Sequence, residues 1–282
     1  KRKISNDELH FILVHQNFEL WFKLIINELR STRDILASDY VEETKLPQAV
    51  HHMNRVIETF HLMAQQWKVM ETLEPQDFLN FRDELGTASG FESIQMREME
   101  ALMGKKWIDG KPAGKDDSNE KSLYEVTCDW LERTPIQGSK SENQVNDFIS
   151  EYLAAHKKLY PDTHQDAVTF FEEDSSLRRR RAGLVFIESY RELPLLAWPR
   201  KLISTLIELE ESMILWRSSH ARMVERMIGR RIGTGGSSGV DYLDMTTKYR
   251  VFIDLWAVRS VLIKKEALPP LKNPDFYEFK GE

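Results

Sequence analysis

Apolar residues recur every three or four positions along most of this chain, and this period constrains the fold more than any other feature. The pattern is clearest over Asp7–Ala37, Leu46–Met70 and Pro199–Gly229. Residues spaced in this way lie on one face of an α-helix, whereas a half-buried strand needs strict alternation. The sequence therefore predicts an all-α fold without convincing strands.

Shorter helical patterns fill the rest of the chain. They cover Asp77–Leu85, Phe91–Met103, Ser122–Glu132, Glu142–Lys158, His164–Phe171, Val185–Leu193 and Asp241–Lys264. The polar stretch 104–121 contains several Gly and Pro residues, which predicts a loop or a small insertion. Because no linker of low complexity divides the chain, we expect one helical domain over residues 1–282.

Composition excludes several classes of protein. No apolar run approaches the roughly eighteen residues of a membrane span, and the net charge of -6 disfavours a nucleic-acid surface. The single cysteine, Cys128, leaves no intramolecular disulfide and no cysteine-built metal site, and it fits a reducing cytoplasm. The one basic run, Arg178–Arg181, indicates either a solvated segment or a region of internal salt bridges, and a nucleic-acid contact is the third alternative.

Residues 229–239 form a glycine-rich segment that contains five of the thirteen glycines. Such a run is typical of a loop that turns sharply or approaches a ligand closely. A phosphate loop would need Lys followed by Ser or Thr after its last glycine, but Gly239 is followed by Val240. The segment is instead rich in hydroxyl groups, among them that of Thr234.

His220 lies on the apolar face of the long helix that precedes this segment. The same face carries Met213, Trp216, Met223 and Met227. A core histidine bonded to a backbone carbonyl is the simpler reading. A neutral imidazole in an apolar slot is also typical of an axial haem ligand.

His15 occupies a similar position on the first predicted helix, where it shares a face with Phe11, Phe18 and Phe22. This spacing indicates either burial in an aromatic layer or a hydrogen bond to a flat aromatic ligand.

Arg82 is the third candidate, four residues after Phe78 and seven before Ser89. Its guanidinium group is suited to a bidentate contact with a carboxylate, and an ion pair with Asp83, Glu84 or an acidic residue elsewhere is the alternative.

Three long motifs resemble the tryptophan 2,3-dioxygenase family. They are His15-Gln-Asn-Phe-Glu-Leu-Trp-Phe-Lys23, Phe81-Arg-Asp-Glu-Leu-Gly-Thr-Ala-Ser-Gly-Phe91 followed by Gln95, and Gly233-Thr-Gly-Gly-Ser-Ser-Gly239, in the family's order. The resemblance is close over Asp7–Glu100 and from about Leu206 to Leu271, and loose over Lys105–Pro199. It implies the helical haem-binding fold of the tryptophan/indoleamine dioxygenase type, haem b as the cofactor, and a cytoplasmic homotetramer.

The resemblance also implies roles for individual residues. His220 would be the axial ligand of the haem iron, with Trp216 and Ser89 close to the haem. His15 would be the catalytic group that binds the indole N–H, and it would bind the substrate together with Phe11, Phe78, Arg82, Ser89 and Thr234. Ser218 and Ser219 depart from the pattern, because some relatives have a basic residue there.

The implied reaction inserts O2 across the indole C2–C3 bond of L-tryptophan to give N-formylkynurenine. A biosynthetic relative that adds one oxygen to a substituted tryptophan, such as a β-methyl derivative, would share these motifs. A haem-binding sensor would share the fold, but it would need neither His15 nor Arg82.

Overall fold

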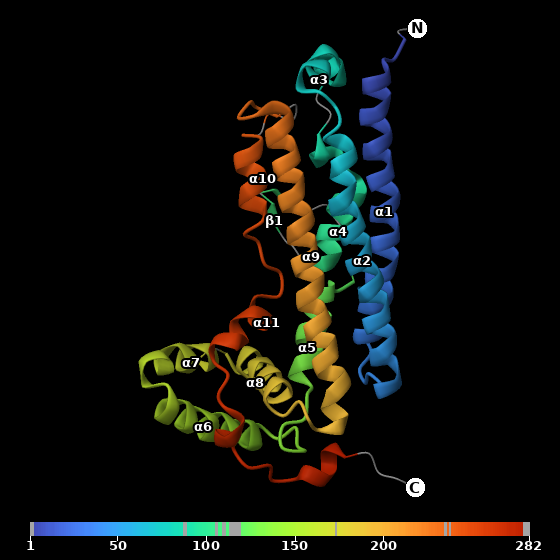
Figure 1. Cartoon of the computed structure of the whole chain (residues 1–282). Helices are drawn as coiled ribbons and strands as arrows, with labels where there is room; N and C mark the ends of the chain where they lie inside the picture. The colour runs from blue at the N-terminus through green and yellow to red at the C-terminus, as the bar shows by residue number, and fades with distance from the viewer. Residues whose placement is uncertain are drawn as a thin grey trace. The chain divides into compact units, whose positions relative to one another are not determined.

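The computed structural model of the chain (Figure 1) describes residues 3–86, 89–104, 107–108, 111–112, 120–172, 174–233, 236 and 238–278. α-Helices make up nearly all of its regular structure, so the all-α prediction is confirmed. The helices are α1 (Asn6–Leu36), α2 (Leu46–Met70), α3 (Pro75–Arg82), α4 (Ile94–Met103), α5 (Leu123–Glu132), α6 (Glu142–Leu159), α7 (His164–Phe171), α8 (Ser175–Ser189), α9 (Ala197–Ile228), α10 (Val240–Thr246) and α11 (Ile253–Ala257).

Two short strands lie within the stretch that the sequence assigns to a loop or insertion. Strand β1 (Trp107–Ile108) pairs antiparallel with β2 (Lys111–Pro112). A strand of two residues is too short to show an alternating pattern, so the sequence carries no signal for it.

The chain forms two compact units, each made of three stretches. The first contains Lys1–Thr32, His51–Ser122 and Glu208–Val251, and the second contains Arg33–Val50, Leu123–Ile207 and Phe252–Glu282. Helices α1, α2 and α9 contribute residues to both units. The prediction of a single domain over 1–282 stays a prediction.

In the first unit, α1, α2 and α9 run side by side (Figure 1). Helix α1 begins after Ser5, whose hydroxyl accepts a hydrogen bond from the Glu8 N–H at 3.1 Å, as expected of an N-terminal cap. Its buried face carries Phe18, whose ring lies 4.2 Å from that of Trp67 on α2. On the same face, Phe22 packs edge-on against Trp216 of α9 at 5.7 Å. The aromatic residues at helical spacing therefore form the core of this unit.

In the second unit, helix α8 contains the basic run and decides between the solvated-segment and salt-bridge interpretations. It begins at Ser175, ten residues before the predicted Val185, and the Asp174 side chain caps it by accepting from the Leu177 N–H at 3.0 Å. Arg181 pairs with Asp254 at 2.9 Å, and the run is therefore a region of internal salt bridges. The solvated-segment alternative is wrong because these tertiary partners compensate the charge.

The predicted helix over Asp241–Lys264 is also wrong, because α10 and α11 are separate helices. Between them, the Val251 N–H donates to the buried carboxylate of Glu210 instead of to a carbonyl one turn earlier. A long-range side-chain acceptor has replaced a helical hydrogen bond, and local periodicity does not reveal such a partner.

Candidate functional site

A cavity of about 850 Å³ lies within the first unit, lined by residues of α1, α2, α3, α4, α9 and α10. This volume is in the range of roughly 300–1,000 Å³ that is typical of sites for small molecules and cofactors. The lining includes these residues of the predicted site: Phe11, His15, Phe78, Arg82, Ser89, Trp216 and His220. Thr234 lies outside the described residues. Side chains from three distant parts of the sequence thus share one cavity.

His220 presents a neutral imidazole to this cavity. Its pKa is lowered to about 3, mainly by burial and to a smaller extent by the charges of His15 and Arg217. Its ring stacks on Trp67, with centroids 4.5 Å apart and planes 13° apart. It makes no hydrogen bond with any residue that the structure describes, so the simpler reading, a core histidine bonded to a carbonyl, finds no support among those residues.

Trp67 is a cavity residue that sequence reasoning missed. It lies on the buried face of α2, and that position indicated only a core residue. The indole nitrogens of Trp67 and Trp216 are both buried and have no hydrogen-bond acceptor among the described residues. Buried donors without acceptors are rare in protein interiors. These two N–H groups therefore distinguish Trp67 and Trp216 from ordinary core residues.

His15 is held in one orientation by its own helix. Its Nδ1 donates to the carbonyl oxygen of Phe11 at 2.8 Å, because a carbonyl can only accept. Burial lowers the pKa of His15, although the Phe11 carbonyl and the charge of Glu19 oppose this effect. In the neutral ring, Nε2 is therefore an acceptor for a ligand N–H.

Aromatic rings form the wall next to His15. The Phe11 ring lies 4.2 Å from the His15 ring, 5.6 Å from Phe78 and 5.8 Å from Phe81. Phe78 and Phe81 pack edge to face at 5.4 Å. Such a wall suits a flat aromatic ligand, which gains both apolar burial and ring contacts.

Arg82 is the last residue of α3, and it contacts the glycine-rich segment. Its guanidinium donates one hydrogen bond to the carbonyl oxygen of Ile232. Among the described residues this is the contact that the group makes, and a guanidinium group with five donors can also bind a second acceptor. The alternative of an ion pair with Asp83 or Glu84 is not the contact that holds the group here.

Helix α9 is anchored by a buried ionic cluster that sequence reasoning also missed. Arg217 donates to Glu100 of α4 at 2.5 Å and to the Thr246 carbonyl of α10 at 3.2 Å. Glu100 also pairs with Arg97 at 2.9 Å. Desolvation lowers the pKa of Arg217, and Glu100 opposes this effect. Because Arg217 precedes His220 by three residues, the cluster fixes the turn of α9 that carries the histidine.

The glycine-rich segment begins and ends with glycines in the left-handed region. Gly229 follows α9 with φ of 59°, and Gly239 precedes α10 with φ of 61°. A Cβ atom at Gly239 would lie 2.7 Å from the carbonyl oxygen of Arg231, which is too close. The sharp turn predicted at the end of this segment therefore requires glycine at position 239.

Within the described part of the chain, no three His, Cys, Asp or Glu side chains gather into a metal site. A single histidine such as His220 is suited to a metal that brings ligands of its own, as an iron in a macrocycle does. Across the same described residues, no helix has the length and apolar character needed to cross a membrane.

Comparisons with known proteins agree with the motifs. The family model for tryptophan 2,3-dioxygenase matches residues 1–169 and 119–262. A tryptophan 2,3-dioxygenase of Sorangium cellulosum is 40% identical, with 100% of this chain and 83% of that protein aligned. Tryptophan 2,3-dioxygenase 2 of Ralstonia nicotianae is 40% identical over 99% of this chain and 92% of its own length. A tryptophan 2,3-dioxygenase of Alteromonas mediterranea is 34% identical over 95% and 87%.

Proposed function

Because this chain belongs to the tryptophan 2,3-dioxygenase family, we propose that it is a haem-dependent dioxygenase that converts L-tryptophan and O2 to N-formylkynurenine. The observation that carries the proposal is the meeting of His15, Arg82 and His220 in one largely apolar cavity. Both oxygen atoms of O2 enter the product as the indole C2–C3 bond breaks, so the reaction balances without an external reductant.

The residues of the cavity fit a haem. His220 offers a neutral imidazole whose hydrogen-bonding capacity is unused among the described residues, and it would hold the haem iron through a ring nitrogen. The stacked indole of Trp67, with the parallel ring of Trp216 at 6.4 Å, would keep the imidazole from rotating. When bound, haem supplies the O2 chemistry that amino-acid side chains cannot perform.

The chain's own residues would bind and orient the substrate. The indole ring would lie against Phe11 and Phe78, and Nε2 of His15 would accept the indole N–H. Arg82 would bind the substrate carboxylate at the end of the cavity next to the glycine-rich segment. The family resemblance adds Thr234 and Ser89 to this set. Holding both ends of one molecule positions the ring for reaction and excludes water.

Mass analysis of the product under labelled O2 tests the proposal. The haem-loaded, reduced protein is given L-tryptophan and 18O2, and the product should be N-formylkynurenine that carries two labelled oxygens. A product with one labelled oxygen, or turnover of only a β-substituted tryptophan, would contradict the proposal in favour of monooxygenation. A protein that binds haem but turns over neither substrate would be a sensor or carrier.

We also propose that the chain assembles as a homotetramer in the cytoplasm. Helix α1 exposes a row of leucines, Leu9, Leu13 and Leu20, at 46%, 54% and 66% of their surface. Apolar side chains aligned along one helix are typical of a surface covered by another subunit. The free thiol of Cys128 fits a reducing compartment. Light scattering on the haem-loaded protein should give four times the chain mass of 33.1 kDa.

A further inference from the structure

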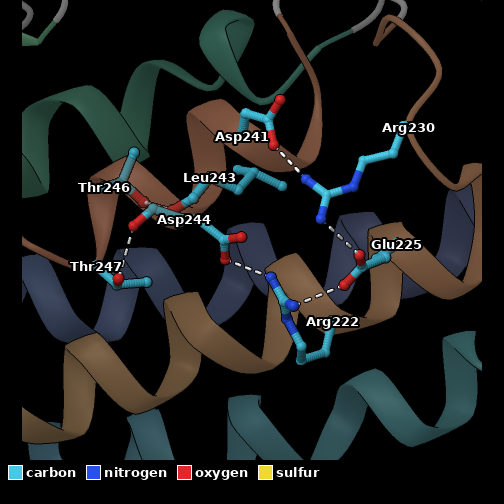
Figure 2. Close-up of polar contacts among 8 residues, drawn as sticks. All are labelled: Arg222, Glu225, Arg230, Asp241, Leu243, Asp244, Thr246 and Thr247. Carbon is cyan, nitrogen blue, oxygen red and sulfur yellow. Dashed lines mark hydrogen bonds and ion pairs between the residues drawn. The ribbon is translucent and has the colours of Figure 1, made fainter.

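Five charged side chains form a continuous chain of ion pairs between α9 and α10 (Figure 2). In order they are Asp244, Arg222, Glu225, Arg230 and Asp241, which we call the α9–α10 ion-pair chain. Each arginine lies between two carboxylates. Arg222 contacts Glu225 at 2.6 Å and also pairs with Asp244, while Arg230 lies 3.3 Å from Glu225 and also pairs with Asp241. The signs of charge alternate along all five members.

The ion-pair chain joins the two ends of the glycine-rich segment. Arg230 follows Gly229 at its start, and Asp241 follows Gly239 at its end. Glycines with positive φ have little conformational preference of their own, so the two ends need other contacts to stay together. The hydroxyl group of Thr247, the residue that follows α10, adds local order by donating to the Asp244 carbonyl at 2.7 Å.

The joined ends lead to the proposed substrate site. Ile232 lies two residues after Arg230, and its carbonyl oxygen accepts the hydrogen bond of Arg82. Gly233, Gly239 and Leu243 from the same region line the cavity. The position of this carbonyl, and with it the direction of the Arg82 guanidinium group, therefore depends on how the ends of the segment are held.

We propose that the α9–α10 ion-pair chain positions Arg82 for recognition of the substrate carboxylate, by holding the Ile232 carbonyl in place. The proposal rests on the proposed function, because it assigns Arg82 to the carboxylate of L-tryptophan. Its members are positioning residues, since none of them lines the cavity.

The ion pairs are exposed, and this sets the size of the expected effect. Arg230 and Asp241 each expose 65% of their side chains, and Arg222 exposes 49%. Water and salt weaken such pairs, so a single neutral substitution should change an affinity by about two- to fivefold. A larger change would require burial that these side chains do not have.

The test compares Arg230→Gln, Asp241→Asn and the double variant in the haem-loaded protein. Each single variant should raise the KM for L-tryptophan by about two- to fivefold and leave kcat nearly unchanged. The KM for tryptamine, which has no carboxylate, should stay within experimental error. Because Arg230 and Asp241 pair with each other, the double variant should raise the KM for L-tryptophan no more than the single variant with the larger effect.

Arg226→Gln is the matched control. Arg226 lies on the same helix, exposes 66% of its side chain and pairs with Glu71, the residue that follows α2, at 2.8 Å, but it does not contact the α9–α10 ion-pair chain. This variant should leave both KM values unchanged. Equal increases of KM for L-tryptophan and tryptamine, or the same increase in Arg226→Gln, would overturn the proposal.

Amide hydrogen exchange separates this proposal from the proposed function. A peptide that covers residues 229–243 should exchange faster in Arg230→Gln and Asp241→Asn than in the wild type, and unchanged exchange would contradict the holding role. If the wild type does not oxidise L-tryptophan, the proposed function fails, and the exchange result still decides whether the ion pairs hold the segment.

Discussion

Replacing His15 tests the most specific contact in the proposed site. In the His15→Ala variant, the substrate's indole N–H loses its acceptor at Nε2. The other ring nitrogen takes no part in this contact, because it donates to the Phe11 carbonyl at 2.8 Å. The substitution therefore removes one hydrogen bond to the ligand and leaves the ligand's donor without a partner.

The expected size of the effect follows from the surroundings of His15. The Phe11 ring lies 4.2 Å from the imidazole and the Trp67 ring 6.2 Å, and neither offers a replacement acceptor in the ring plane. A buried donor left unsatisfied costs about 1–3 kcal/mol, which corresponds to a loss of roughly 5- to 150-fold in kcat/KM. Water that enters the vacated space would bring the loss toward the lower end, so residual activity should remain.

The assay measures kcat/KM for L-tryptophan and for 1-methyl-L-tryptophan, which has no indole N–H. His15→Ala should lose activity with the first substrate and change little with the second, relative to the wild type with each. His15→Gln, which supplies an amide oxygen, should recover part of the loss. Equal losses with both substrates would refute the hydrogen bond and indicate that His15 acts through packing or proton transfer.

Three further predictions concern the other cavity residues. Arg82→Met should cost about 2–5 kcal/mol in kcat/KM for L-tryptophan but far less for tryptamine, and equal losses would make Arg82 structural. His220→Ala should fold as helix by circular dichroism but lose most of its haem, and a variant with full haem content and an unchanged Soret band would contradict the assignment. In haem-free protein, the pKa of His220 is about 3 when folded and 6.5 when unfolded, so its contribution to stability is present above pH 6.5 and is lost as pH falls toward 3. Urea unfolding should therefore show about 1 kcal/mol less stability at pH 5.5 than at pH 7, and His220→Gln should lack this part of the pH dependence.

The helical period predicted much of the fold, and the family resemblance predicted that the candidate residues gather in one site. Three- and four-residue spacing placed His15 beside Phe11 and placed His220 beside Trp216, and these pairs do share one cavity. Spacing along one helix determines which side chains lie on the same face, because a helix is rigid over a few turns. The bounds of α2 and α7 were predicted for the same reason.

Long-range polar contacts could not be predicted in this way. Glu100 and Arg217 are 117 residues apart, and each alone is consistent with a solvated charge. The sequence could not decide between the alternatives for the basic run in α8, because its partner Asp254 lies 73 residues away from Arg181. Trp67 has the spacing of any core residue, and its stacking on His220 is what identifies it as a residue of the site. One signal was available, since Arg217 lies one turn before His220 on the same helix.

Helix α9 also restricts how the length of this chain can change during evolution. It directs His220 into the cavity, while Arg222, two residues later, pairs with Asp244 of α10 outside the cavity lining. Each residue advances an α-helix by about 100°, so inserting or deleting one residue between Arg217 and Arg222 would rotate one group away from its partners whichever part of the helix stayed fixed. Substitutions in this turn can be compensated by neighbours, but a change of register cannot. We therefore expect insertions and deletions among relatives to avoid residues 213–228 and to occur instead in the connecting segments.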